Sequence, residues 1–246
     1  MTGAPDLTTA AAIRERLAVV RERISSAASR AGRDPAEVTL VAVSKTHGPE
    51  VVRAAAEAGQ HLFGENRVEE AAPKMQSLAA AGLEWHMIGH VQTRKAREVI
   101  QSQFALVHSV DTVKLGERLG MLAAQAGQRQ AVLLEMNVSS EASKSGFGAS
   151  QPQHWPELLA SVAELADAPG LEVRGLMTMA PQVEQPDSAR PFFERLRQLQ
   201  DFLRRQLPAG VGPELSMGMS DDFEVAIAAG ATLVRIGRAI FGERGQ

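Results

Sequence analysis

Apolar residues near the start of the chain recur at the spacing of an α-helix. Intervals of four, three and four residues separate Ile13, Leu17, Val20 and Ile24. A stripe with this spacing lies on one face of a helix and predicts that the helix packs against a core. Gly32 and the following RDPAE segment interrupt the pattern, so we expect a helix and a turn within residues 1–37.

Eight short runs of β-type apolar residues follow, and segments with helical periodicity separate them. The runs cover residues 38–43, 61–64, 84–89, 104–110, 131–138, 171–177, 214–219 and 232–237. One intervening segment, PFFERLRQLQDFLRR, places four apolar residues on a common helical face: Phe192, Leu196, Leu199 and Leu203. Parallel strands need crossover connections, and an alternation of strands and helices supplies them.

This alternation predicts an α/β protein that is a single (β/α)8 TIM barrel with an extra N-terminal helix. An open, doubly wound parallel sheet is the alternative, and the strand count favours the barrel. No linker rich in Pro, Gly or Ser divides the alternation. We therefore expect one domain over residues 1–246, with the barrel over residues 38–242.

Composition narrows the possible functions. The net charge of −3 gives no reason to expect a nucleic-acid partner. No apolar stretch approaches the ~20 residues of a membrane span, and the N-terminus lacks the basic and apolar parts of a secretory leader. We therefore expect a cytoplasmic protein that does not bind membranes. The absence of cysteine excludes thiol catalysis and thiolate metal sites.

A metal site formed by His86 and His90 is also not expected. The two histidines are four residues apart, a spacing that some metal sites use on a helix. Here they fall on a predicted strand, where this spacing separates them by ~13 Å. We therefore predict no metal ligands.

Lys45 lies just beyond the first apolar run, after Ser44, where a barrel carries its functional residues. Burial at the barrel mouth would lower the pKa of its amine and leave a nucleophile for an aldehyde or ketone. The alternative is a lysine that extends its ammonium group from the barrel rim into solvent.

The ends of the last two runs have the composition of an anion site. Gly237 precedes a predicted helix, and the free N–H groups at a helix N-terminus bind phosphate. Ser216 and Ser220 close the seventh run, although Ser220 also fits the N-cap of the next helix. A phosphate site opposite a Schiff-base lysine indicates pyridoxal 5′-phosphate.

Seven segments carry a resemblance to a known family. In order, they are LVAVSKTH, FGENRVEE, EWHMIGHVQTRKAREV, HSVD, MNVSSEASKSGFG, GLMTMAP and LSMGMSDDFEVAIAAGATLVRIGRAIFG. Together they resemble the YggS/PROSC family of pyridoxal phosphate homeostasis proteins, from about residue 38 to residue 242. The resemblance implies a barrel like that of bacterial alanine racemase.

The resemblance also implies which residues bind the cofactor. Lys45 would hold pyridoxal 5′-phosphate as an internal aldimine, Asn66 would lie near the ring, and Arg235 would face the pyridine nitrogen. The phosphate would be held by Ser216, Ser220 and the backbone of Gly237 and Arg238. The sequence departs from the family pattern at the rim of the site. Many members have tyrosine at the position of Arg67, and asparagine is frequent at the position of Arg94.

Arg235 favours a carrier over an enzyme. Its guanidinium cannot accept the proton of the pyridine nitrogen, so the ring would be a poor electron sink. Racemases with such an arginine use a tyrosine as a second base, supplied with a separate β-rich domain. This sequence has no tyrosine and ends soon after the last motif. We therefore expect storage and delivery of the cofactor as a reversible aldimine, without catalytic residues.

Two alternatives remain open. One is a racemase-like enzyme of narrow scope that uses the cofactor on an amino acid, with Lys45 as the base. The other is a cofactor-free Schiff-base enzyme that acts on a phosphorylated carbonyl compound. For the carrier, the candidate partners are apo forms of enzymes that depend on pyridoxal phosphate. Nothing in the sequence requires a dimer, so we expect a monomer.

Overall fold

Eight parallel strands form a closed barrel in the computed structural model, which describes residues 9–141 and 144–242. The strands are β1 (Thr39–Val43), β2 (Leu62–Glu65), β3 (Glu84–Met87), β4 (Leu106–Val110), β5 (Gln130–Asn137), β7 (Leu171–Met177), β8 (Glu214–Ser216) and β9 (Leu233–Ile236). They pair in chain order, and the pairing of β1 with β9 closes the ring. The structure therefore confirms the (β/α)8 barrel and excludes the open sheet.

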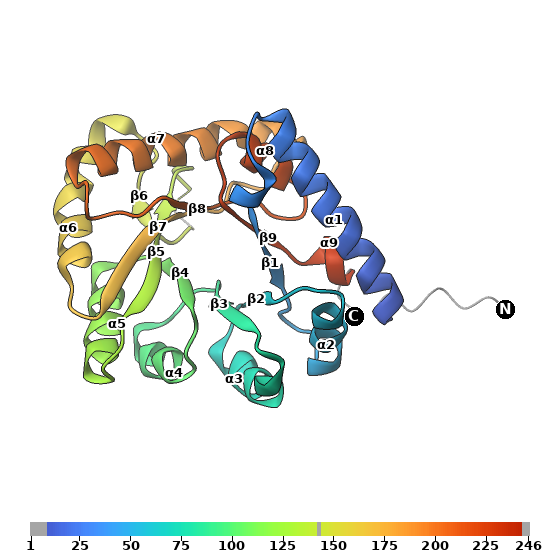
Figure 1. Ribbon diagram of the computed structural model, residues 1–246. Helices are drawn as coiled ribbons and strands as arrows, with labels where there is room; N and C mark the ends of the chain where they lie inside the picture. The colour runs from blue at the N-terminus through green and yellow to red at the C-terminus, as the bar shows by residue number, and fades with distance from the viewer. Residues whose placement is uncertain (1–8, 142–143, 243–246) are drawn as a thin grey trace.

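Helices surround the barrel and connect its strands (Figure 1). They are α1 (Ala10–Arg30), α2 (Pro49–Glu57), α3 (Val68–Ser77), α4 (Ala96–Gln101), α5 (Val113–Gln125), α6 (Leu159–Asp167), α7 (Arg190–Gln206), α8 (Phe223–Ala228) and α9 (Arg238–Phe241). Short 3-10 helices occupy Pro35–Glu37, Ala79–Ala81, Thr93–Lys95, Pro152–Leu158 and Pro186–Ala189. No helix in the described part of the chain is long and apolar enough to cross a membrane.

The extra N-terminal helix, α1, lies against the elements that close the barrel. Thr9 caps it, because its side chain accepts a hydrogen bond from the N–H of Ala12 (3.3 Å). Figure 1 shows α1 running past α8 and α9. The predicted stripe of Ile13, Leu17, Val20 and Ile24 is buried along its whole length.

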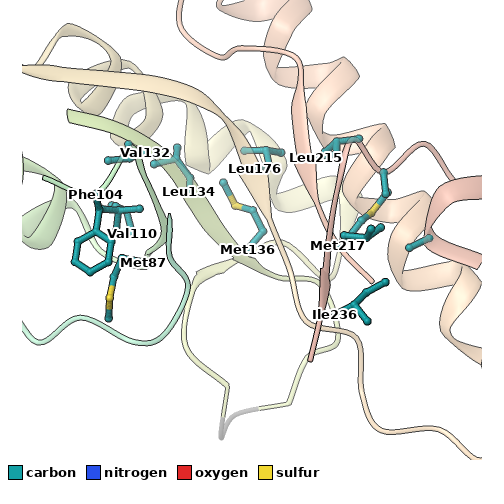
Figure 2. Packing of buried hydrophobic residues seen from close by; sticks show 14 of the residues in the cluster. Met87, Phe104, Val110, Val132, Leu134, Met136, Leu176, Leu215, Met217 and Ile236 are labelled. Carbon is teal, nitrogen blue, oxygen red and sulfur yellow. The ribbon is translucent and has the colours of Figure 1, made fainter. Parts of the chain in front are cut away.

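Apolar side chains form two layers because successive strand residues point to opposite faces of the barrel wall. The outer layer lies between the wall and the helices, and Figure 2 shows part of it, including Val132 and Leu134 of β5. The inner layer fills the barrel, and its buried members are Val41, Leu106, Ala131, Leu133, Met177 and Leu233. The interior of the barrel is therefore a packed core at this level.

The structure differs from the sequence expectations in three local features. On α7, Phe193 is fully buried with Leu196, Leu199 and Leu203, whereas the predicted Phe192 is only partly buried. The seventh run is strand only as far as Ser216, since Gly218 turns the chain with a φ of +92°. A two-residue strand, β6 (Phe147–Gly148), pairs with β5 outside the barrel order and has no apolar run to announce it.

We predict that Leu17→Ala lowers the free energy of unfolding by about 2–5 kcal/mol, because it leaves a cavity under α1. Leu17 is fully buried, whereas Val19 of the same helix is 54% exposed. Val19→Ala is therefore the matched control, with an expected change within about 0.5 kcal/mol. Urea unfolding of both variants measures the difference. Equal effects of the two substitutions would show that burial of this face of α1 does not stabilise the protein.

Candidate functional site

The inward-facing side chains change from apolar to polar toward the carboxyl ends of several strands. On three strands an inner-layer leucine is followed, two residues later, by a buried ionisable side chain: Leu106 by His108, Leu133 by Glu135, and Leu233 by Arg235. Residues two apart on a strand share a face, so these side chains also point into the barrel. The polar interior therefore lies directly beneath the carboxyl mouth.

A chain of hydrogen bonds crosses this interior. Arg235 donates through Nη1 to the hydroxyl of Ser216, and that oxygen lies 2.8 Å from Nδ1 of His108. Nε2 of His108 lies 2.9 Å from Nδ1 of His86, and Nε2 of His86 lies 3.2 Å from Oε1 of Glu84. The chain thus runs from β9 near the mouth to the first residue of β3 at the opposite end.

The two ends of this chain fix its direction. A guanidinium group only donates, and a carboxylate only accepts. The Ser216 hydroxyl therefore accepts from Arg235 and donates to His108, and each imidazole passes a donated hydrogen bond toward Glu84. Burial lowers the pKa of His108 well below its usual value, which keeps this ring neutral with a single N–H. Each donor in this series of hydrogen bonds then faces an acceptor.

Arg235 keeps its charge in this setting. Burial lowers its pKa to about 10, while Glu135 and Asp222 act in the opposite direction. The guanidinium is therefore still protonated at neutral pH. Its Nη2 also donates to the carbonyl oxygen of Thr178 (3.0 Å), the residue that follows β7. The structure thus holds a fixed cation beneath the mouth, rigidly oriented by bonds to two neighbouring strand ends.

Lys45 lies at the corner of a β-turn directly above β1. The N–H of His47 donates to the carbonyl oxygen of Ser44 (3.2 Å), and Thr46 has a φ of +68°. A positive φ at the third position is the pattern of a type II turn, in which Lys45 is the second residue. Lys45 is half-buried and lies two residues beyond Val43, the last residue of β1.

The N-terminus of α9 lies next to this turn. A Cβ on Gly237 would lie 3.1 Å from the carbonyl oxygen of Val43, so glycine allows the close approach of β9 to β1. The hydroxyl of Ser220 accepts a hydrogen bond from the N–H of Ala239 (3.4 Å). Arg238 is exposed at the first position of α9 and forms an ion pair with Asp221. Backbone N–H groups, a hydroxyl and a cation thus gather at one end of the mouth.

Two further residues predicted from the sequence, Asn66 and Ser216, differ in their surroundings. Asn66 follows β2 and is half-buried. Its backbone packs closely on Gly89, because a Cβ on Gly89 would lie 2.2 Å from the carbonyl oxygen of Asn66. Ser216 is fully buried, and its hydroxyl is engaged by Arg235 and His108 inside the barrel. Its hydroxyl therefore supports Arg235 from within the barrel.

Ser220 is not the N-cap of α8, the second role that its sequence position allowed. The N-cap of α8 is Asp222, two residues later, and its Oδ1 accepts the N–H of Met219 (2.6 Å). The hydroxyl of Ser220 instead faces α9. This placement keeps Ser220 beside Gly237 and Arg238, the residues with which the sequence analysis grouped it.

Sequence reasoning missed two sets of residues around the mouth. One is the imidazole pair in the barrel interior: His86, which was weighed only as a metal ligand, and His108, for which the alternation within LVHSV was the available signal. The other is Lys74 of α3, which is 5% exposed and contacts the turn of Lys45. Among residues 9–141 and 144–242, no group of three or more His, Cys, Asp or Glu side chains could hold a metal ion.

The arrangement suits one class of ligand. An amine on a turn, donors for an anion at the N-terminus of α9, and a buried cation beneath the mouth match a phosphorylated carbonyl compound. The cation would meet the part of such a ligand that lies deepest in the barrel.

Comparison with known proteins identifies relatives that span nearly the whole chain. The family model for the N-terminal domain of alanine racemase matches residues 15–245. A pyridoxal phosphate homeostasis protein of Aquifex aeolicus is 44% identical over 230 residues, which cover 94% of this chain and 97% of the relative. The Escherichia coli K12 protein of the same name is 44% identical over 243 residues, with 94% and 97% covered.

Solved structures agree with this result. PipY of Synechococcus elongatus, solved without PLP, superposes with a TM-score of 0.82 at 35% identity and covers 94% of this chain and 100% of its own. The same protein with PLP bound gives a TM-score of 0.80. Alanine racemase of Corynebacterium glutamicum shares the fold, with a TM-score of 0.66 at 20% identity, over 93% of this chain and 62% of its own.

We predict that Glu135→Gln makes the protein more stable at neutral pH. Burial, together with the charge of Asp111, raises the pKa of Glu135 above its usual value of 4.5. Between the usual and the raised pKa, the folded state binds more protons than the unfolded state. The contribution of the Glu135 carboxyl to the free energy of unfolding therefore falls as the pH rises. The gain from the substitution should therefore grow as the pH rises above the usual pKa of 4.5 and shrink as the pH falls toward it.

Denaturant unfolding between pH 4 and pH 8 measures this dependence. Glu184→Gln is the control, because Glu184 is exposed and its replacement should leave the stability profile unchanged. A loss of stability at pH 7 in Glu135→Gln would show that the ionised carboxylate stabilises the fold, contrary to the prediction.

Proposed function

This chain belongs to the family of the pyridoxal phosphate homeostasis proteins, and we propose that it binds pyridoxal 5′-phosphate (PLP) through Lys45. The observation that carries the proposal is the position of the Lys45 turn beside the N-terminus of α9. An amine and an anion site that are adjacent at one barrel mouth match two groups of PLP, its reactive aldehyde and its anionic phosphate. PipY, a relative with the same fold, has PLP bound.

The donor set of the structure fits this cofactor. Ser220 and the first backbone N–H groups of α9 would bind the phosphate, with the exposed Arg238 nearby as a cation. Asn66 would contact the ring from the end of β2. Arg235 would meet the pyridine nitrogen as a hydrogen-bond donor, since its guanidinium stays charged. Ser216 would hold Arg235 in this orientation from below.

The residues around the mouth favour reversible binding of PLP over turnover. Bound PLP supplies an electron sink to an enzyme when its ring nitrogen is protonated. Arg235 cannot accept a proton, and its bonds to Ser216 and Thr178 fix it as a donor. The sequence has no tyrosine to act as a second base. These features support a carrier that stores PLP and releases it to apo forms of PLP-dependent enzymes.

One chain is sufficient for this site. All of the proposed contacts come from strand ends and helix termini of a single barrel, from β1 around to α9. The same arrangement supports the proposal that the protein works as a monomer.

We predict that PLP binds covalently to Lys45 and that Lys45→Ala abolishes this bond. Purified wild-type protein incubated with PLP should absorb visible light, and borohydride should bleach it and fix the mass of PLP on Lys45. Lys114→Ala, which removes an exposed lysine of α5, should behave like the wild type. A wild-type protein that acquires neither the absorption nor the fixed mass would refute PLP binding at Lys45.

We further predict that the PLP-loaded protein has no turnover at enzymatic rates. Racemisation and related reactions of a broad panel of amino acids should remain well below the roughly 1–10³ s⁻¹ of typical enzymes. Transfer of PLP to an apo enzyme, followed by recovery of that enzyme's activity, should succeed under the same conditions. Rapid racemisation that disappears in Lys45→Ala would replace the carrier by the racemase-like alternative.

A further inference from the structure

Helix α3 contacts both peptide groups that flank the Cα of Lys45. On one side, Nζ of Lys74 donates to the carbonyl oxygen of Ser44 (2.9 Å). On the other side, Oε1 of Glu70 accepts the N–H of Thr46 (2.5 Å). Glu70 and Lys74 also form an ion pair with each other (3.2 Å). One pair of side chains, four residues apart on a helix, thus holds the backbone before and after Lys45.

The ammonium group of Lys74 is fully used in this arrangement. It has three N–H donors, and three acceptors surround it: the Ser44 carbonyl, Oε1 of Glu65 (2.6 Å) and Oε1 of Glu70. The Ser44 hydroxyl also donates to Oε1 of Glu65 (2.7 Å). Lys74 is 5% exposed and Glu65 is fully buried. Ionised side chains this deep are retained only when they are paired, so this cluster has a fixed geometry.

The turn needs such support because Thr46 has a φ of +68°. This conformation is unfavourable for a β-branched residue and persists where the surrounding structure determines it. The hydrogen bond from the Thr46 N–H to Glu70 is formed in this conformation, and it ties the turn to a helix outside the barrel wall.

We propose that Glu70 and Lys74 are positioning residues that clamp the two peptide groups around Lys45 and so aim its amine at the aldehyde of PLP bound at α9. This inference rests on the proposed function of Lys45. The clamp acts through the backbone of the turn and does not touch the phosphate-binding end. Its loss should therefore slow the formation of the covalent bond more than it weakens the noncovalent capture of PLP.

A second ion pair on the same helix provides a matched control. Glu69, next to Glu70, pairs with Lys95 (2.8 Å), and the Glu69 side chain is 55% exposed. Glu69→Ala therefore removes a carboxylate of α3 that has a lysine partner outside the turn. Glu70→Gln is the conservative variant, because its amide oxygen can still accept the Thr46 N–H.

The first readout needs no PLP. Hydrogen exchange of the Thr46 amide, followed by NMR, should be about tenfold faster in Glu70→Ala than in the wild type, because one hydrogen bond is lost. Glu70→Gln should restore most of the protection. Glu69→Ala should match the wild type.

The second readout is the rate of the covalent bond to Lys45, measured by the visible band and by borohydride trapping. Glu70→Ala should slow it by about tenfold to a hundredfold, as expected for a misplaced reacting group. Glu70→Gln should recover it, and Glu69→Ala should leave it unchanged. Saturation with PLP separates this rate from capture, whose half-saturation concentration should change by less than the rate.

Lys74 requires a different design, since its removal alone would leave Glu65 as an unpaired buried charge. The double variant Glu65→Gln with Lys74→Met avoids this charge, and circular dichroism verifies that it folds. In this variant the bond to Lys45 should also form slowly. Formation at the wild-type rate would overturn the role of Lys74.

The outcomes separate the two proposals. If the wild type forms the Lys45 adduct, and Glu70→Ala changes neither the Thr46 exchange nor the adduct rate, the clamp is refuted and the proposed function stands. If the wild type forms no adduct at all, the proposed function fails and the positioning role falls with it.

Discussion

The site depends on the pairing of β1 with β9, the strands that close the barrel. Val41 pairs with Arg235 and Ala42 with Ile236, although these residues lie near opposite ends of the chain. The pairing brings the turn of Lys45 beside Gly237, and the lack of a Cβ at this glycine permits the approach. The turn of Lys45 and the N-terminus of α9 therefore come together only after the barrel has closed, which is a long-range event in folding.

Buried polar groups hold Arg235 and the turn of Lys45 from different sides of the barrel wall. Inside the barrel, Arg235 is held through Ser216 and the imidazole pair. Outside the wall, Lys74 and Glu65 lie beneath the turn of Lys45. Loss of one partner from a buried ion pair costs about 3–5 kcal/mol, because the other charge is left uncompensated. The barrel thus carries charged groups that are costly to bury, and their directional bonds set the geometry of the mouth.

The parts of the structure that the sequence predicted are those that follow from regular burial. The eight runs and the stripe from Ile13 to Ile24 consist of apolar residues that the barrel buries. Along a strand every second residue shares a face, and helices bury residues at intervals of three or four, so both patterns are visible in the sequence. The strand-end residues were predictable for the same reason. Their surroundings were not. Ser216 and Ser220 are four residues apart, yet one is enclosed by Arg235 and His108 while the other faces α9.

Helix α3 shows why such surroundings cannot be read from spacing alone. Glu70 and Lys74 are four residues apart, the pattern of an ordinary surface ion pair, and the neighbouring Glu69 forms such a pair with Lys95. An exposed pair contributes about 0–1 kcal/mol and leaves the backbone free. Lys74 points instead toward the end of β1, where the Ser44 carbonyl and Glu65 share its ammonium group. Only the packing of α3 against β2, beside the end of β1, separates the two cases. That packing converts a common helical pair into a support for the turn of Lys45.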